Sequence, residues 1–268
     1  MESSGMALDA TGIPTGCMGL CSRGPLVRVM RRGGEEIWYQ SVNDEVAVDI
    51  IRDHIRMRKP VETNVLDQNI PFFTSQERVV LANGGIIDPD RIEGYVAHGG
   101  YRALEKVLKN MAPEDVLAEV AASGIRGRGG AGYPVGSKWA LLAKAEGDVK
   151  YLVANGDEGD PGAYMDRTVM EDDPHRLLEG MAIAAYATGA TKAYIYVRAE
   201  YPQAVERLDR AIRIAGRNRL LGRKILESEF NLGVGNRVGW LQWAQTAVFV
   251  LPLALLGVPV GMFAALFA

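Results

Sequence analysis

Apolar and polar residues follow different periods in different parts of this chain. Residues 26–30 and 36–40 have the composition of short strands and are joined by two glycines, where a hairpin turn needs positive φ. A helix is predicted next, with Asp44 as its N-cap and apolar residues at helical spacing over 46–55, up to the break at Pro60. The first part of the chain is therefore predicted to be a small α+β unit.

A middle stretch, residues 61–100, shows neither the helical period nor the alternation of a strand. Pro71, the Asn-Gly-Gly turn at 83–85 and the Asp-Pro turn at 88–89 interrupt it. This stretch is predicted to be a linker with little regular structure.

Helical and strand patterns alternate in residues 101–238. Strands are predicted at 151–154 and 193–197, and helices at 104–108, 113–120, 138–145, 174–187 and 202–215. Such alternation is typical of a parallel sheet flanked by helices. The predicted fold class is therefore α/β.

The last stretch, residues 239–268, is an apolar tail. No charged residue follows Arg237, and nearly every residue from 247 onward is apolar. The tail is long enough to span a bilayer, and the basic residues before it would put the main body on the cytoplasmic side. Pro252 and Pro259 weaken a straight helix, and a buried terminal helix is the alternative.

Composition narrows the class of protein. With 268 residues, 48% of them hydrophobic, the chain can bury a core for one large domain and a smaller one. A formal net charge of −3 argues against nucleic-acid binding, because no broad basic face is available for phosphates. Two cysteines are too few for a disulfide framework, and the N-terminus does not resemble a secretory signal. A cytoplasmic location is expected.

A glycine-rich loop at residues 124–132 holds five glycines and two arginines ahead of a predicted helix that carries Lys138. Glycines let the backbone approach a ligand, and a helix N-terminus with nearby cations favours a phosphate. The spacing is neither that of the dinucleotide fingerprint nor that of a P-loop. A phosphate site is predicted, with a flexible surface loop as the alternative.

An acidic loop at residues 155–162 leaves the carboxyl end of the predicted strand 151–154, which is where open α/β sheets bind ligands. Its carboxylates and amide could accept hydrogen bonds from ribityl or ribose hydroxyls, or bind a hard cation. A solvated acidic turn is the alternative. Together the two loops suggest a nucleotide cofactor.

Cys17 and Cys21 are the only cysteines, and two thiolates do not supply the four ligands of an iron-sulfur cluster. Two ordinary thiols are the alternative to half of such a site. His54, His98 and His175 are scattered without partners at metal-ligand spacing and are predicted to be structural.

Four strings together resemble the FMN- and NADH-binding, 51 kDa-type flavoprotein subunit of NADH dehydrogenase (complex I) and of NAD(P)-linked hydrogenases. They are GIRGRGGAGYPVGSKW, ANGDEGDPGAYMDR, EDDPHRLLEGMAIAAYA and YIYVRAEYPQAVERL. Upstream, TGCMGLCSRGPLVRV and IPFFTSQERVVLANGGIIDP are similar to the hydrogenase version, which has an N-terminal thioredoxin-like ferredoxin domain. The resemblance covers about residues 15–239.

The resemblance implies a domain division: a partial thioredoxin-like 2Fe-2S unit at 1–60, a linker at 61–100, a Rossmann-like FMN/NAD-binding domain at 101–238 and the tail at 239–268. It also implies an oxidoreductase subunit, an NAD(P)H dehydrogenase (diaphorase). FMN would take a hydride from NAD(P)H and pass electrons to iron-sulfur clusters of a larger complex, and the hydride chemistry would belong to the flavin.

The resemblance also implies the site residues. Those that contact the flavin would be Gly127, Arg128, Gly129, Gly130, Lys138, Asn155, Asp157 and Glu158. Tyr133 stands where the family has a phenylalanine that stacks on the adenine of NADH, and it keeps an aromatic face. Leu141 replaces a second aromatic residue. Asp160 occupies the acidic position beside the nicotinamide.

By the same resemblance, Cys17 and Cys21 would be the second cysteine pair of a 2Fe-2S domain, with the first pair upstream. A Gly-Glu-Glu motif after Arg237 and later ligands of a 4Fe-4S cluster do not appear, and the apolar tail begins at about Trp240. This change suggests a frameshifted or truncated reading frame, and a membrane anchor is the alternative.

Three functions follow from the sequence. The first is an electron-entry subunit that works with other subunits of an NADH dehydrogenase or hydrogenase complex. The second is a non-catalytic remnant or fusion that lacks complete cofactor sites. The third, a phosphate-binding module for another small ligand, would be favoured if the two loops lay far apart. Membrane contact is expected only through the tail.

Overall fold

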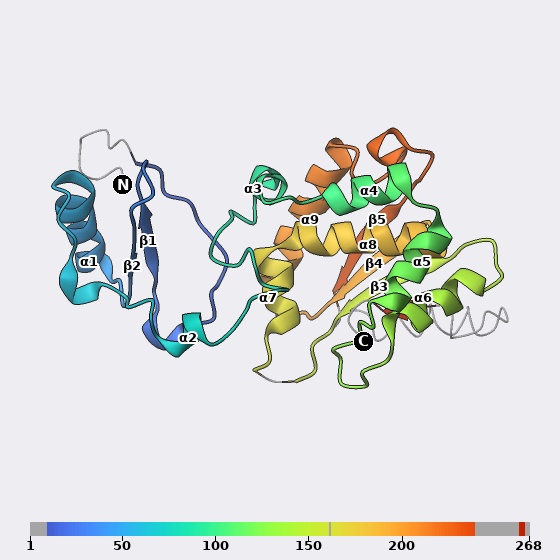
Figure 1. Cartoon of the computed structure of the whole chain (residues 1–268), viewed down its shortest axis with the longest axis horizontal. Coiled ribbons are helices and arrows are strands. Elements are labelled where there is room, and N and C mark those ends of the chain that lie inside the picture. Colours follow the sequence, from blue (N-terminus) through green and yellow to red (C-terminus); the bar gives the residue numbers. More distant parts are fainter. Residues whose placement is uncertain (1–9, 161, 239–262, 266–268) are drawn as a thin grey trace.

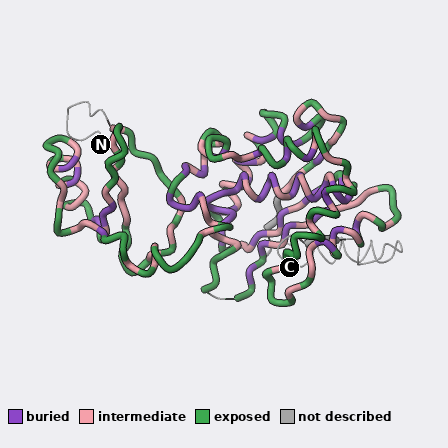
Figure 2. The backbone as a smooth tube through the Cα atoms, viewed as in Figure 1, coloured by how far each residue is buried: buried purple, intermediate pink, exposed green. Residues whose placement is uncertain are grey.

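The computed structural model describes residues 10–160, 162–238 and 263–265. Figure 1 shows a small N-terminal unit, an extended linker and a larger α/β unit. Buried residues are concentrated in the strands and central helices of the larger unit (Figure 2). This arrangement agrees with the predicted α/β fold, whereas the domain boundaries at 60, 100 and 238 and the thioredoxin-like character of the first unit stay predictions.

The N-terminal unit is the predicted hairpin with a helix against it. Strands β1 (Val27–Met30) and β2 (Glu36–Tyr39) pair antiparallel, after a short 3-10 turn η2 (Cys21–Arg23). Helix α1 (Asp44–Asp49) continues into the π-helical turn η3 (Ile50–Arg56). A small core of its own forms around Tyr39, Val42 and Ile50.

The predicted N-cap of α1 was wrong by one residue. Asn43, not Asp44, has the extended backbone of a cap, and its Oδ1 accepts a hydrogen bond from the Val46 N–H at 2.9 Å. Asp44 is already the first helical residue, where its negative charge faces the positive end of the helix.

The linker is more ordered than predicted, although its elements are short. It contains η4 (Glu62–Asn64), α2 (Pro71–Thr74) and α3 (Ile92–Ala97). A groove lined in part by Trp38, Phe73 and Arg78 lies where the linker passes the hairpin.

The larger unit is built on a parallel sheet in the order β5-β4-β3-β6. Its strands are β3 (Tyr151–Gly156), β4 (Lys192–Val197), β5 (Gly233–Val238) and β6 (Phe263–Ala265). Side chains of β3 and β4 alternate, so that Leu152, Ala154, Ala193, Ile195 and Val197 are buried while the residues between them are partly exposed or, in the case of Lys192, exposed.

Helices pack around this sheet and supply most of the core (Figure 1). They are α4 (Arg102–Asn110), α5 (Pro113–Ala122), α6 (Val135–Lys144), α7 (Met165–Asp172), α8 (Pro174–Thr188) and α9 (Pro202–Arg217), with the short 3-10 turn η5 (Ile225–Glu227) before β5. Helix α8 is the most buried, since its Leu178, Met181 and Ala185 are fully inaccessible. Helix α7 and strand β5 were not predicted.

Most of the apolar tail lies outside the described residues, namely 239–262 and 266–268. Of the remainder, Phe263–Ala265 pairs in parallel with β3. None of the helices within the described residues is long and apolar enough to cross a membrane.

Candidate functional site

The glycine-rich loop is a narrow finger between α5 and α6. At its base, the Gly127 N–H donates to the Tyr133 carbonyl at 2.9 Å and the Val135 N–H donates to the Ile125 carbonyl at 3.0 Å. Arg126 crosses the finger, because its Nη1 donates to the Gly132 carbonyl at 3.0 Å. The base of the loop is therefore closed by its own backbone.

The tip of the finger holds the residues predicted to contact a phosphate. Arg128, Gly129 and Gly130 are all exposed. Gly130 and Gly132 have φ values of 103° and 61°, which favour glycine and turn the chain at the tip. Backbone N–H groups and a guanidinium at such a tip are suited to binding an anion.

Two further predicted residues, Tyr133 and Lys138, stand where the finger meets α6. The Lys138 Nζ lies 5.9 Å from the centroid of the Tyr133 ring, within cation–π range. The Tyr133 side chain is 44% exposed and Leu141 is 59% exposed, so both present apolar surface to solvent. Gly136 sets the start of α6 against α5, since a Cβ there would lie 2.5 Å from the Cα of Ala121.

The acidic loop begins at the carboxyl end of β3, as predicted. The Oδ1 of Asn155 accepts a hydrogen bond from the Asp157 N–H at 3.0 Å, which turns the chain as it leaves the strand. Asp157 and Asp160 are exposed. Their carboxylates are therefore accessible to a ligand.

Glu158 differs from the other two carboxylates because it is only 9% exposed. Its Oε1 accepts hydrogen bonds from the N–H groups of Met165 and Asp166, at 2.8 and 3.4 Å, and its Oε2 accepts one from the Tyr201 hydroxyl at 3.5 Å. This carboxylate therefore holds the first turn of α7. Burial, and then the charge of Glu158, raise the pKa of Asp166 to about 6.

Arg198 was missed by the sequence analysis and supports the acidic loop from the neighbouring strand. Its Nη1 donates to the Glu158 carbonyl, and its Nε lies 4.0 Å from the Asp157 Oδ1. The guanidinium also pairs with Glu200 at 3.2 Å and lies 5.7 Å from the centroid of the Tyr201 ring. Its position directly after β4, at the same edge of the sheet as the acidic loop, could have identified it.

The third string, residues 171–187, is largely buried. The Glu179 carboxylate accepts hydrogen bonds from the N–H groups of Tyr101 and Leu104, at 2.8 and 3.0 Å, and from the Tyr95 hydroxyl. His175 is hydrogen-bonded through Nδ1 to the Tyr101 hydroxyl at 2.8 Å. Desolvation lowers the pKa of His175 to about 4. This part of the chain therefore holds α3 and α4 in place.

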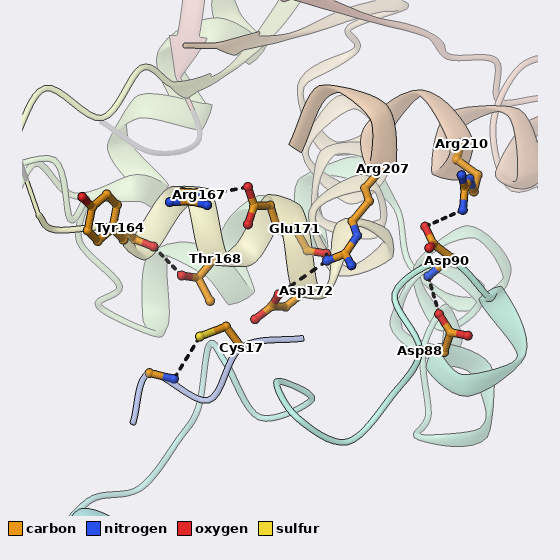
Figure 3. Close-up of polar contacts among 11 residues, drawn as sticks. Cys17, Asp88, Asp90, Tyr164, Arg167, Thr168, Glu171, Asp172, Arg207 and Arg210 are labelled. Carbon is orange, nitrogen blue, oxygen red and sulfur yellow. Dashed lines mark hydrogen bonds and ion pairs between the residues drawn. The ribbon is translucent and has the colours of Figure 1, made fainter. Parts of the chain in front are cut away.

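Asp172 and Asp173, at the junction of α7 and α8, also serve the packing. Asp173 accepts hydrogen bonds from the Asn83 Nδ2 at 2.7 Å and from the Arg176 Nε at 2.8 Å. Figure 3 shows Asp172 between Arg207 and the backbone that carries Cys17. Desolvation raises the pKa of Asp172 to about 6, although a hydrogen bond from the Cys17 backbone opposes this shift.

Cys17 and Cys21 are exposed and unpaired by a disulfide. The Cys17 Sγ accepts a hydrogen bond from the Gly19 N–H at 3.3 Å (Figure 3). Within the described part of the chain, no three His, Cys, Asp or Glu side chains gather as metal ligands. The half-site for a 2Fe-2S cluster stays a prediction.

The three histidines have the structural surroundings that the sequence suggested. His54 Nδ1 is hydrogen-bonded to the Tyr39 hydroxyl at 2.7 Å, and His98 Nδ1 to the Gly94 carbonyl at 2.9 Å. His175 lies in the buried cluster with Tyr101.

Residues 120–241 match a family model described as the Nuo51 FMN-binding domain of the Complex1_51K family. This part of the chain is similar to the members of that family. The match begins in α5 and includes both loops, β3, β4 and Glu179, whereas the hydrogen-bond partners of Glu179 lie before it. The matched segment is thus the larger α/β unit without α4, most of α5 and β6.

Curated relatives agree with this assignment. An NADH-quinone oxidoreductase subunit of Rhizobium meliloti is 49% identical over 59% of this chain and 38% of its own length. The NADP-reducing hydrogenase subunit HndC of Solidesulfovibrio fructosivorans is 48% identical over 61% of this chain and 33% of its own length. The chain thus spans well under half the length of these relatives.

Among solved structures, an NAD+-reducing nickel-iron hydrogenase in the H2-reduced state aligns at 24% identity and a TM-score of 0.45, covering 87% of this chain and 37% of that one.

Proposed function

We propose that this chain is the FMN-binding part of an electron-entry subunit, which takes a hydride from NAD(P)H onto FMN. Its partners would be other subunits of an NADH dehydrogenase or hydrogenase complex. The observation that carries the proposal is the match of residues 120–241 to the FMN-binding domain, because that segment contains the glycine-rich loop and the acidic loop. The relatives are named as subunits of such enzymes.

The chemistry of the donor set fits a flavin mononucleotide. The loop tip offers backbone N–H groups and the Arg128 guanidinium for the phosphate, while Asn155 and Asp157 offer acceptors for ribityl hydroxyls. All of these groups except Asn155, which is partly buried, are exposed, so a ligand can reach them. The approach of the two loops to one flavin stays part of the proposal.

The residues that would hold this flavin are Gly127, Arg128, Gly129, Gly130, Lys138, Asn155 and Asp157. When bound, FMN supplies the hydride acceptor, which no side chain of the protein can replace. Lys138 adds positive charge beside the finger. Glu158 was also predicted to contact the flavin, but its hydrogen bonds to α7 favour a role in holding the acidic loop.

Tyr133 and Asp160 would receive the nicotinamide nucleotide. The half-exposed Tyr133 ring can stack on an adenine, whereas Leu141 offers only an aliphatic surface. The Asp160 carboxylate is exposed at the outer part of the acidic loop. It can accept a hydrogen bond from a carboxamide.

A complete iron-sulfur cluster does not fit the described residues. Cys17 and Cys21 provide two thiols, and a cluster needs four ligands.

The test is the visible absorption of the purified chain titrated with FMN, before and after NADH is added without oxygen. Saturable binding followed by bleaching of the flavin band is expected. Arg128→Ala should weaken FMN binding roughly tenfold, because a charge-assisted hydrogen bond to the phosphate is lost. Arg213→Ala, an exposed arginine on α9, is the matched control.

Failure of the wild-type chain to bind FMN at any concentration would overturn the proposal. Binding that Arg128→Ala and Arg213→Ala reduce equally would remove the glycine-rich finger from the site.

A further inference from the structure

Three segments that are far apart in the sequence meet beside α7. They are the cysteine segment (residues 16–21), the linker loop (residues 79–86) and the acidic pair, Asp172 and Asp173. Gly16, the residue before Cys17, packs directly against the Asp172 carboxylate. Asn83 of the linker loop donates to Asp173 at 2.7 Å. The junction of α7 and α8 therefore contacts both of the other segments through adjacent carboxylates.

The fit leaves no room for a Cβ on Gly16 or Gly85 at the contact. A Cβ on Gly16 would lie 2.2 Å from the Asp172 Cγ, and a Cβ on Gly85 would lie 2.5 Å from the Met18 Cγ. Beside them, a Cβ on Gly84 would lie 3.4 Å from the Cys17 carbonyl oxygen. Backbone therefore packs directly on backbone and on the Asp172 carboxylate.

Arginine side chains lie around the contact and stabilise it. Arg207 of α9 lies 3.7 Å from the Asp172 Oδ1, and Arg176 binds Asp173 from the other side. Arg176 also donates to the Val79 carbonyl at 3.3 Å, and Arg78 donates to the Met18 carbonyl. Arg207 and Arg176 thus place positive charge beside the acidic pair. Arg176 and Arg78 also donate hydrogen bonds to the backbone of the linker loop and of the cysteine segment.

We propose that the acidic pair is a docking site for the cysteine segment, and that Asp172 is the residue that positions Cys17 on the larger α/β unit. Packing of the Gly16 backbone on Asp172 fixes the place of Cys17 whatever its thiol binds. Cys21, four residues on, lies in the turn η2. The proposal concerns the flavin-free chain and does not rest on the proposed function.

The experiment is amide hydrogen exchange of the full flavin-free chain, followed by mass spectrometry in peptides that cover residues 10–24. Asp172→Ala is expected to speed exchange at Cys17 roughly tenfold, because the cysteine segment loses the side chain on which it packs and opens more often. Gly16→Ala should do the same, since its methyl group pushes the segment off Asp172.

Two matched controls are available. Asp90→Ala removes a comparable ion pair to α9, that between Asp90 and Arg210 at 2.9 Å (Figure 3), and should leave exchange at Cys17 unchanged. Gly24→Ala adds a methyl group in the same peptide, where the nearest atom lies at an ordinary 3.7 Å and φ is −70°, and should also have no effect.

Wild-type exchange rates in both Asp172→Ala and Gly16→Ala would overturn the proposal. If Asp172→Ala does not fold, Gly16→Ala decides alone, because Gly16 lies outside every helix and strand. FMN titration of the same samples separates the two proposals: a chain that binds no FMN can still show docking, and a chain without docking can still bind FMN.

Discussion

The glycine-rich finger and the buried string at 171–187 both point to the same family, yet the structure uses them in opposite ways. At the finger, Arg128, Gly129 and Gly130 face solvent. In the buried string, Glu179 and His175 are only 7% and 2% exposed and are hydrogen-bonded to other parts of the chain. One motif is therefore exposed at the proposed ligand site and the other is used for packing, and burial distinguishes them.

The largest effect that separates these two regions is expected at Glu179. Glu179→Ala leaves the N–H groups of Tyr101 and Leu104 and the Tyr95 hydroxyl without their acceptor. The free energy of unfolding should fall by about 3 kcal/mol or more, measured by urea denaturation. Glu206→Ala, on the surface of α9, is the control and should change little. A Glu179→Ala protein as stable as wild type would contradict a packing role for the buried string.

His175 should give the next largest effect, as a dependence of stability on pH. Burial lowers its pKa from 6.5 to about 4. Between pH 6.5 and pH 4, His175 is therefore protonated in the unfolded chain and neutral in the folded chain. Its contribution is present above pH 6.5 and is lost as pH falls toward 4, by about 3 kcal/mol at most. His175→Gln keeps a hydrogen-bond acceptor for Tyr101 and should remove this dependence.

The measurement is the difference in unfolding free energy between wild type and His175→Gln at pH 7 and pH 5. The difference isolates His175, because Asp166 titrates in both proteins. The raised pKa of Asp166 acts in the opposite sense, since its contribution is present below pH 3.8 and is lost as pH rises through about 6. An unchanged difference at the two pH values would mean that water reaches His175 in the folded state.

A smaller loss is expected where the finger is anchored. Gly136→Ala places a methyl group 2.5 Å from the Ala121 Cα and must push α6 away from α5, at about 1–3 kcal/mol. Gly180→Ala, in α8, meets nothing within 4 Å and should be neutral or slightly stabilising. Thermal unfolding of both variants makes the comparison. Equal midpoints would show that the base of the finger is loose rather than packed.

Local patterns predicted the hairpin, α4, α5, α8, α9, β3 and β4, because in these elements the apolar period matches the structure. They did not predict α7, whose apolar pair Val169 and Met170 gives no sustained period; the helix begins where the distant Glu158 accepts its first N–H groups. They also missed β5, which contains Gly233, Gly235 and Asn236 and forms by pairing with β4.

The candidate site shows the same limit. The two loops were evident from composition, since glycines and carboxylates are concentrated in them. Arg198 was not, because a single arginine after a strand has no local signature. Its contact with the Glu158 carbonyl joins residues 40 positions apart. What local patterns could not reveal was the support that other strands provide to each loop.

The smallest change in stability, and the sharpest test of the comparison, is expected at Arg198. Arg198→Gln removes the guanidinium that approaches Asp157 at 4.0 Å and bonds to the Glu158 carbonyl, so the acidic loop loses its orientation while the core is untouched. The thermal midpoint should match wild type, and FMN affinity should fall roughly tenfold, because Asn155 and Asp157 are no longer held in place.

Arg198→Lys should restore part of the affinity, since its ammonium can still pair with Asp157. Arg210→Gln, which breaks an ion pair with Asp90 away from both loops, should leave affinity unchanged. If Arg198→Gln unfolds the chain instead, the acidic loop belongs with the buried string as a packing device, and the finger alone remains as the ligand site.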